Sequence, residues 1–503
     1  MVVKLKTAQI FNSNMVLQRE QNVRVWGEGR NNSNVTVLLG DHKVTTKVIE
    51  CKWSVELPRM EAGGPYTMVI TDGLDEITYY NIMVGEVWLA GGQSNMEMEL
   101  QNCLNGVEEV KEADYEMIRF YNTAKIATLD EEDLQEEAKS RWMPVKPYSA
   151  GKMSAVAYFF AREVQKKLGI AVGIIDCYWG GSSICCWMSE EKIECDLDAH
   201  IYSEEWRELV GEQSMEEYEY EVELFRKNLR RWIDESEELK IENPNITMWE
   251  IVKLIGECPW EHPFGYKSPY RPAGLYYTMI QRVAPYNIKG VLWYQGEQDA
   301  NKADIYHKML MHLIDQWRTE WMDETLPFYI VQLPMWIDKN STDDKSWAVI
   351  REAQRYVTET IKNTYLTVLS DCGEYDNIHP LDKKTVGYRL AMQVLNYSYK
   401  YKELYVEGPK YLQRDLKDGR IVLYFKHVDG GFITKGSEKI ELFEIAGDDK
   451  KFVEADAVIV GDTIEVSNDK VKNPKYARFA WTNYGIVNLF NAKGLPLAPF
   501  ATR

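Results

Sequence analysis

The sequence lacks the long apolar segments and the cysteine framework that mark several large classes of protein. No window approaches the roughly 18 uninterrupted apolar residues of a membrane-spanning helix. The start, MVVKLKTAQIF, lacks the apolar run and cleavage site of a signal peptide, so we expect a cytoplasmic protein. A secreted form whose signal had been removed would look the same. The 8 cysteines show no CxxC spacing and are too sparse among 503 residues for a disulfide framework, so we expect reduced thiols.

Positive charge is also scarce. Lys plus Arg number 59 against 78 for Asp plus Glu, which gives a formal net charge of −19. Such a chain repels phosphate backbones and anionic lipid unless it carries a basic patch, and no basic run stands out. We therefore expect neither nucleic acid nor a membrane as a partner. P-loop, GxGxxG and HExxH motifs are missing too, and no cofactor or metal is predicted.

The composition is that of a globular protein, with 45% apolar and 27% charged residues. Short β-rich runs separated by Gly, Asn and Asp turns predict an N-terminal β domain over residues 1–83. A second β-rich stretch covers 405–503, and the two β regions could form one accessory unit. Between them, 84–404 alternates apolar runs with amphipathic stretches. Within it, about 200–270 is rich in charge at helical spacing and predicts a helical insertion.

Apolar runs of the kind found in buried strands alternate with helical patterns in the middle region. Strands are predicted at 87–90, 172–178, 289–294, 327–333 and 365–370, and helices at 154–168, 304–319, 346–361 and 383–395. Strands that alternate with helices favour an α/β fold with a doubly wound parallel sheet.

Polar motifs follow four of these strands. They are GGQSNM at 91–96, GGSS at 180–183, QGEQD at 295–299 and DNIHP at 376–380. Ligands of open α/β sheets bind beyond the carboxyl ends of the strands, so we expect these four motifs to share one crevice. Together they supply a serine, a glycine turn, an amide and an Asp/His pair, which are the parts of a serine esterase.

Each residue type has a chemical reason to be there. Ser94 needs a base before its hydroxyl becomes a nucleophile, and the imidazole of His379 titrates near neutrality. Asp376, three residues earlier, could fix the tautomer of that ring. A developing oxyanion needs fixed donors, and the backbone N–H groups of Ser94 and of Gly180 or Gly181 and the amide of Gln295 are the candidates.

Each motif alone also has a plain structural explanation, as a turn, a core amide or a buried histidine. The GxSxG elbow of α/β-hydrolases is absent, because residue 96 is Met. Glu97 and Glu99 could instead suggest the carboxylate pair of a glycosidase, although charged residues are usually solvated.

The motifs resemble one known family. Residues 85–97, GEVWLAGGQSNME, are similar to the nucleophile block of the sialate O-acetylesterase family within the SGNH hydrolases. Further stretches that resemble the family are MVLQR at 15–19, VWG at 25–27, VLWYQGE at 291–297, IHP at 378–380 with GYRLA at 387–391, GLP at 494–496 and PF at 499–500.

The resemblance implies an SGNH-type α/β sandwich, a Ser94–His379–Asp376 triad and no cofactor. It places the oxyanion between Ser94, the Gly180 turn and an amide of the third block. Family members commonly have Ser-Asn after Gly-Glu where this chain has Gln298-Asp299, so the third donor is Gln295 or Gln298. The acidic partner of the histidine could also be Glu297.

The substrate implied is an acetylated carbohydrate. Sialic acid is the first candidate, and acetylated xylan or another polysaccharide is the alternative. A catalytically silent carbohydrate-binding protein, or a peptidase with the same triad, are the other classes considered. A sialate would need a cation, for which the candidates are Arg162, Arg271 and Arg351. Aromatic candidates for stacking on sugar are Trp179, Trp187 and Trp260, although core packing more often explains such residues.

Overall fold

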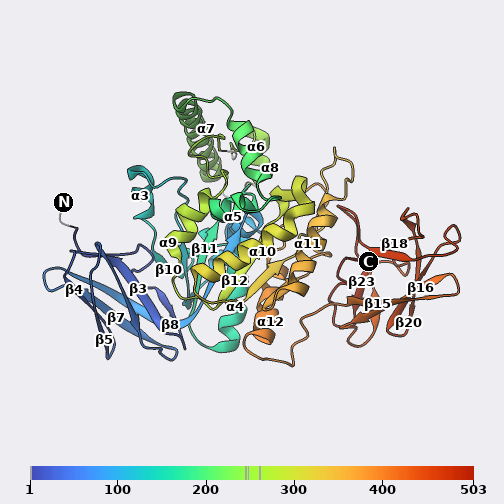
Figure 1. Ribbon diagram of the computed structural model, residues 1–503, viewed down its shortest axis with the longest axis horizontal. Helices are drawn as coiled ribbons and strands as arrows, with labels where there is room; N and C mark the ends of the chain where they lie inside the picture. The colour runs from blue at the N-terminus through green and yellow to red at the C-terminus, as the bar shows by residue number, and fades with distance from the viewer. Residues whose placement is uncertain (1–2, 244–245, 247, 260–261, 503) are drawn as a thin grey trace.

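The longest strand, β8 (Glu76–Gly92), joins an N-terminal β region to the central sheet (Figure 1). Its first part pairs antiparallel with β7 (Gly63–Thr71), and its second part lies parallel between β11 (Val172–Tyr178) and β12 (Gly290–Tyr294). The domain boundary predicted between residues 83 and 84 therefore falls inside one continuous strand. The computed structural model describes residues 3–243, 246, 248–259 and 262–502.

The central sheet carries strands in the order β10-β9-β11-β8-β12-β13-β14. The remaining strands are β9 (Tyr115–Asn122), β10 (Trp142–Val145), β13 (Phe328–Val331) and β14 (Thr364–Thr367). From β9 to β14 all neighbours are parallel, while β10 returns antiparallel at one edge. The α/β class is confirmed, but the sheet is mixed rather than wholly parallel, because β10 is a short return strand beside β9.

Helices pack around this sheet (Figure 1). The principal ones are α4 (Ala155–Leu168), α10 (Ala303–Glu320), α11 (Ser346–Thr360) and α12 (Lys383–Tyr397). Helix α4 begins where the Ser154 hydroxyl accepts a hydrogen bond from the N–H of Ala157, and it ends at Gly169 with φ of 69°. A serine N-cap and a left-handed glycine are common at helix ends. For this reason the helix predicted at 154–168 agrees closely with α4.

The N-terminal region consists of strands that pair on two sheets. They are β1 (Lys6–Thr7), β2 (Val16–Gln18), β3 (Val23–Glu28), β4 (Asn34–Leu39), β5 (His42–Lys47) and β6 (Lys52–Leu57). Strand β6 alternates exposed and buried residues, as expected of a strand with one solvated face. Strand β2 lies parallel to β8 and fixes the region to the central sheet.

A buried carboxylate strengthens this junction. Glu86 of β8 is fully buried, and it accepts hydrogen bonds from Arg19 Nε at 2.5 Å and Gln18 Nε2 at 2.9 Å. The Gln18 side chain also accepts from the N–H of Val87 at 2.8 Å. A buried charge of this kind needs its partners, since losing one leaves an uncompensated carboxylate. The MVLQR and GEV motifs therefore hold two parts of the fold together.

The C-terminal region is a separate set of small sheets. Its strands are β15 (Lys410–Lys417), β16 (Arg420–Lys426), β17 (Phe432–Thr434), β18 (Phe443–Ala446), β19 (Val453–Glu454), β20 (Asp456–Val460), β21 (Thr463–Ser467), β22 (Tyr476–Phe479), β23 (Leu489–Asn491) and β24 (Phe500–Ala501). The two β regions lie at opposite ends of the molecule (Figure 1). The expectation that they form one accessory unit is therefore wrong.

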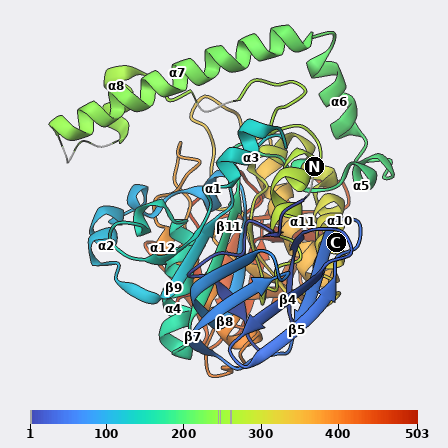
Figure 2. The ribbon, with the colours of Figure 1, turned by 90° about the vertical axis from the view of Figure 1, so that its left-hand side faces the viewer.

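Between β11 and β12 the chain makes a helical excursion. Helices α5 (Glu190–Glu194), α6 (Ile201–Val210), α7 (Met215–Glu242) and α8 (Met248–Ile255) belong to it. Figure 2 shows α7 extended across the top of the molecule, away from the sheet. Helix α7 starts with a capping box in which Ser214 and Glu217 satisfy each other's backbone N–H. Across the described helices, none is long and apolar enough to cross a membrane.

Shorter helices complete the fold. They are α1 (Ser94–Glu97), α2 (Gly106–Glu112), α3 (Glu131–Glu137) and α9 (Gln281–Val283).

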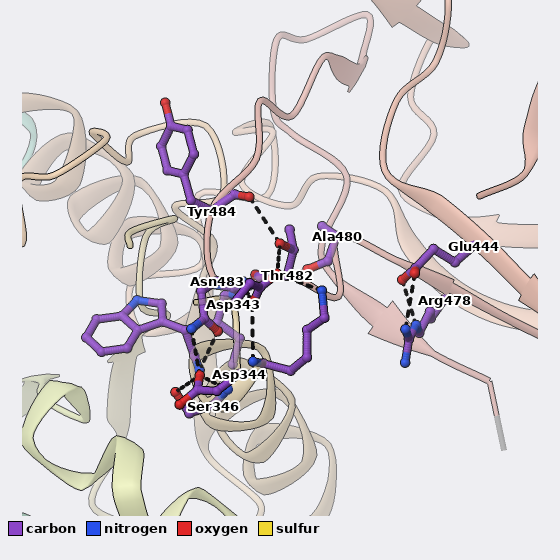
Figure 3. A network of polar contacts seen from close by, with 12 residues as sticks. Asp343, Asp344, Ser346, Glu444, Arg478, Ala480, Thr482, Asn483 and Tyr484 are labelled. Atoms are coloured by element: carbon purple, nitrogen blue, oxygen red, sulfur yellow. Dashed lines mark hydrogen bonds and ion pairs between the residues drawn. The ribbon is translucent and has the colours of Figure 1, made fainter. Parts of the chain in front are cut away.

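A polar junction connects the C-terminal region to α11 (Figure 3). Asn483 donates from Nδ2 to Asp344 at 2.8 Å, and its Oδ1 accepts from the N–H of Trp347 at 3.0 Å. The N–H of Asn483 in turn donates to Asp343 at 3.0 Å. Arg351 of α11 is fully buried and donates to the carbonyls of Ala480 and Thr482. This junction supports the loop between β13 and α11.

Replacing Asn483 by alanine tests the junction. The change leaves the Trp347 N–H and one contact of Asp344 unpaired, so we expect the free energy of unfolding to fall by about 1–3 kcal/mol. The midpoint of urea unfolding, followed by tryptophan fluorescence, measures the loss. Asn31→Ala on the exposed surface is the matched control and should leave the midpoint unchanged. Equal midpoints for both variants would contradict the role given to Asn483.

Candidate active site

The end of β8 delivers Ser94 to the edge of the sheet. Gly92 has φ of 139°, and a Cβ there would lie 2.0 Å from the carbonyl oxygen of Tyr294 in β12. Only glycine fits this approach. The chain then turns, the N–H of Gln93 donates to the same carbonyl at 3.1 Å, and α1 begins at Ser94. The serine therefore sits at a helix N-terminus, beyond the carboxyl ends of the parallel strands.

The structure brings Ser94 and His379 together. His379 Nε2 lies 2.8 Å from Ser94 Oγ, across 285 residues of chain. Burial lowers the pKa of His379 to about 4, and the ammonium of Lys383 adds to the effect. At neutral pH the ring is therefore uncharged, with a lone pair available for a proton. A hydroxyl and a neutral imidazole in this contact can perform nucleophilic chemistry.

Asp376 is not brought to the histidine. Its carboxylate accepts from the backbone N–H of Lys339 at 3.0 Å and pairs with Lys339 Nζ at 2.9 Å. The lysine N–H and ammonium lower the pKa of Asp376, so it is ionised. Within the described residues no hydrogen bond joins Asp376 to His379. Two members of the predicted triad, Ser94 and His379, are therefore in contact. The third, Asp376, points to the loop after β13 instead.

A buried network links the serine helix to the histidine loop. Asn95 donates from Nδ2 to Glu297 at 2.6 Å and to the carbonyl of Ile378 at 2.9 Å. Its Oδ1 accepts from Lys383 Nζ at 2.5 Å. Burial raises the pKa of Glu297 and lowers that of Lys383 to about 8. Glu297, the other acidic candidate, therefore contacts Asn95 rather than the imidazole.

Sequence reasoning did not identify Asn95 and Lys383. Both are almost fully buried although polar, with exposures of 0% and 1%. Asn95 directly follows Ser94, and Lys383 lies four residues after His379. This closeness in sequence was the only available indication that they belong to the site. A buried lysine must be paired, and the pairing required the fold to be known.

The four oxyanion candidates differ in their contacts. In the described part of the chain the backbone N–H groups of Ser94 and Gly181 have no hydrogen-bond partner, whereas the N–H of Gly180 donates to Glu97 at 2.6 Å. The Gln295 amide donates to Gln93, to the carbonyl of Ser182 and to Asp299. Its donors are thus already engaged beneath the site.

The alternative third donor, Gln298, has an exposed side chain and its backbone N–H donates to Gln93 Oε1 at 3.3 Å. Gln93 Oε1 also accepts from Gln295 and from the N–H of Gly296. Gln93, which precedes the serine, therefore ties β8 to the loop after β12. The sequence motifs did not predict this role for Gln93.

The proposed glycosidase pair is divided between different partners. Glu97 contacts Lys125 and Gly180, and Glu99 accepts from Gln101 Nε2 at 2.6 Å. No group of three or more His, Cys, Asp or Glu residues that could hold a metal occurs among the residues described.

The cation candidates have other contacts. Arg162 pairs with Glu109 at 2.6 Å, Arg351 serves the C-terminal junction, and Arg271 donates to the carbonyl of Ser268 at 2.6 Å. Of the tryptophans, Trp187 is buried and donates to Ser182, while Trp179 is half-buried. Trp260 lies outside the described residues.

Comparisons with known proteins identify relatives of the whole chain. A family model for a carbohydrate esterase, sialic acid-specific acetylesterase, matches residues 260–396. The sialate O-acetylesterase of Mus musculus is 28% identical over 81% of this chain and 76% of its own length. That of Homo sapiens is 25% identical over 99% of this chain and 92% of its own. A solved carbohydrate acetylesterase from Xanthomonas citri aligns over 99% of both chains with 28% identity and a TM-score of 0.79.

These findings confirm the resemblance that the motifs predict. The class of carboxylic ester hydrolase is supported by a family model, by curated relatives and by a solved structure of the same fold. The matched segment 260–396 contains Gln295, Glu297 and His379.

The charge state of His379 is directly testable. We expect NMR titration of the His379 imidazole to give a pKa near 4, because burial and Lys383 both disfavour the cation. In Lys383→Met the second cause is gone, and the pKa should rise while staying below 6.5. Lys384→Met, which removes an exposed ammonium next to it, is the control and should cause little change. A wild-type pKa near 6.5, or equal shifts in both variants, would contradict this account.

Proposed function

We propose that this protein is a serine esterase that removes O-acetyl groups from a carbohydrate. The observation that carries the proposal is the 2.8 Å contact between Ser94 Oγ and His379 Nε2 at the ends of parallel strands. The class of ester hydrolase indicated by the relatives agrees with it. We also propose that the catalytic domain is of the SGNH type, with the serine block after β8 and the histidine loop after β14.

The reaction begins with proton transfer. His379 accepts the Ser94 proton at Nε2 while Oγ attacks the acetyl carbonyl carbon. The low pKa of His379 keeps the base unprotonated at neutral and mildly acidic pH. The imidazolium then gives the proton to the sugar oxygen, and the bond between the acetyl carbon and that oxygen breaks, which leaves acetyl-Ser94 and a free sugar hydroxyl. Water, deprotonated by the same imidazole, attacks the acetyl-serine and releases acetate.

The negative charge that develops on the carbonyl oxygen needs donors. The N–H groups of Ser94 and Gly181 are the best placed, since neither has another partner in the described residues. Removing such a donor typically lowers kcat by about 10²–10³. Gly180 could serve as a third donor only after the Glu97 carboxylate leaves its N–H. Gln295 supports Gln93 and the turn instead.

The names of the curated relatives point to sialic acid as the first candidate substrate. The Xanthomonas citri relative is named more broadly as a carbohydrate acetylesterase, which keeps other acetylated saccharides open. A catalytically silent carbohydrate-binding protein is less well supported, because binding alone does not require a serine and a neutral imidazole in contact.

Acetate release by wild type and Ser94→Ala tests the reaction. We expect the variant to lose about 10⁴-fold or more in kcat, since the nucleophile is removed. The substrates are 9-O-acetyl sialic acid, an acetylated xylo-oligosaccharide and p-nitrophenyl acetate. Ser341→Ala, at an exposed turn, is the control and should behave as wild type. Equal rates for Ser94→Ala and wild type would overturn the mechanism, and saccharide binding without turnover would favour the binding protein.

Asp376→Asn separates a triad aspartate from a loop support. In serine proteases the same change at the triad aspartate lowers kcat by about 10⁴. Because the Asp376 carboxylate contacts Lys339, we expect a loss in kcat/KM below roughly tenfold here. Lys339→Met should produce a similarly small change, since it breaks the same pair. A loss of about 10³-fold or more in Asp376→Asn alone would return Asp376 to the triad.

A further inference from the structure

A hollow of about 310 Å³ is lined by residues of the motifs that follow β11 and β12, among them Gly181, Ser183 and Gln298. One of its walls includes Gly181, the residue after Gly180, which packs against Ser94 so closely that an added Cβ would lie 3.4 Å from Ser94 Cβ. The lining also includes Gln298, whose N–H donates to Oε1 of Gln93, the residue before Ser94. Strands β11 and β12, which precede these residues, flank β8. The residues that line the hollow therefore adjoin residues in contact with Ser94 or Gln93, although Ser94 and His379 do not line it themselves.

The helical excursion supplies an apolar stripe to this hollow. Tyr202, Trp206 and Leu209 of α6 all line it, and their spacing of four and three residues puts them on one face of the helix. Leu209 is 57% exposed. An amphipathic helix normally buries such a face in a core, whereas α6 presents it to an open space.

Aromatic rings from the end of the excursion extend the stripe. Phe264 lies edge-to-face on Trp206, with ring centroids 5.7 Å apart, and Tyr270 lies 5.9 Å from Phe264. All three line the hollow, and Trp206 and Phe264 are only half-buried. The rings therefore form a connected wall that is partly open to a ligand.

The charges on the hollow cancel. Glu205 and Lys302 pair with each other, and Lys302 Nζ also lies 5.1 Å from the centre of the Tyr202 ring. They are the only ionisable Asp, Glu, Lys or Arg side chains among the described residues that line it. The side-chain amides of Gln298 and Asn301 give it a polar rim. Such a surface suits a neutral ligand with an apolar face and several hydroxyl groups.

We infer that the hollow binds a neutral pyranose unit joined to the acetylated unit of the substrate. One C–H face of that sugar packs against Trp206 and Phe264, and its hydroxyl groups reach Gln298 and Asn301. The preferred substrate is then an acetylated oligosaccharide rather than a free acetylated monosaccharide. This inference rests on the proposed esterase function, since it assigns the second unit of the same substrate.

Trp206→Ala tests the subsite. We expect kcat/KM for an acetylated oligosaccharide to fall by roughly tenfold or more, mainly through KM, because a large apolar contact is lost. The rate on p-nitrophenyl acetate, which has no second sugar, should change less than about twofold. Trp206→Phe should restore most of the oligosaccharide activity. Tyr220→Ala, on the exposed face of α7, is the matched control because Tyr220 is 71% exposed and does not line the hollow. Equal losses on both substrates, or none on the oligosaccharide, would overturn the inference.

Two further measurements test the subsite, and the first uses the unaltered protein, so it does not depend on how the variants fold. Wild type should act on an acetylated disaccharide with a higher kcat/KM than on the monosaccharide that carries the same acetyl group, and equal values would overturn the subsite. Calorimetric titration of Ser94→Ala with the deacetylated oligosaccharide should show binding that Trp206→Ala in the same background loses. If the oligosaccharide binds but wild type hydrolyses no ester, the proposed function is overturned and the subsite is kept. If wild type hydrolyses p-nitrophenyl acetate but the oligosaccharide does not bind, the subsite is overturned and the proposed function is kept.

Discussion

The close approach between the end of β8 and β12 at Gly92 is the constraint on which the rest of the site depends. There is no room for a Cβ beside the Tyr294 carbonyl, so residue 92 must be glycine. The positive φ of this glycine lets the chain turn out of the sheet and begin α1 two residues later. The serine then stands at a helix N-terminus with its N–H unpartnered among the described residues. A larger residue at 92 would have to move one of two central strands, so the position of Ser94 is set by the packing of the sheet itself.

The second half of the site reaches Ser94 through a polar core. Asn95 connects the serine helix to the Ile378 carbonyl of the histidine loop, and Lys383 and Glu297 hold its side chain from either side. Both ionisable groups are buried, and Glu297 Oε2 has no partner among the described residues. A buried polar network lowers stability unless each of its polar groups has a hydrogen-bond partner. We therefore explain this network by its positioning of Ser94 and His379 rather than by a gain in stability. The Lys383 ammonium also adds to burial in lowering the pKa of the His379 imidazole.

Much of this arrangement was predictable because it follows local rules. Strand 172–178 is a run of buried β-formers between turn residues, and it matches β11 residue for residue. The serine and histidine follow strand ends, so their convergence follows from topology. The partner of Asp376 was not predictable, since Lys339 comes from a loop held by the C-terminal junction. The engagement of Gln295 was equally hidden, because its acceptors Gln93 and Asp299 depend on tertiary packing.

In the proposed function, reaction and recognition come from different parts of the chain. Ser94 directly follows β8 and His379 lies in the loop between β14 and α12, whereas Trp206 and Phe264 belong to an excursion that stands outside the sheet. Helix α6 packs Tyr202 into the main core, whereas Trp206 and Leu209 of the same face line the hollow and stay partly or largely exposed. If the proposed subsite holds, changes in the excursion alter the saccharide that is bound while the ester chemistry stays the same. Relatives that share the sheet can on this basis differ in the sugar they accept.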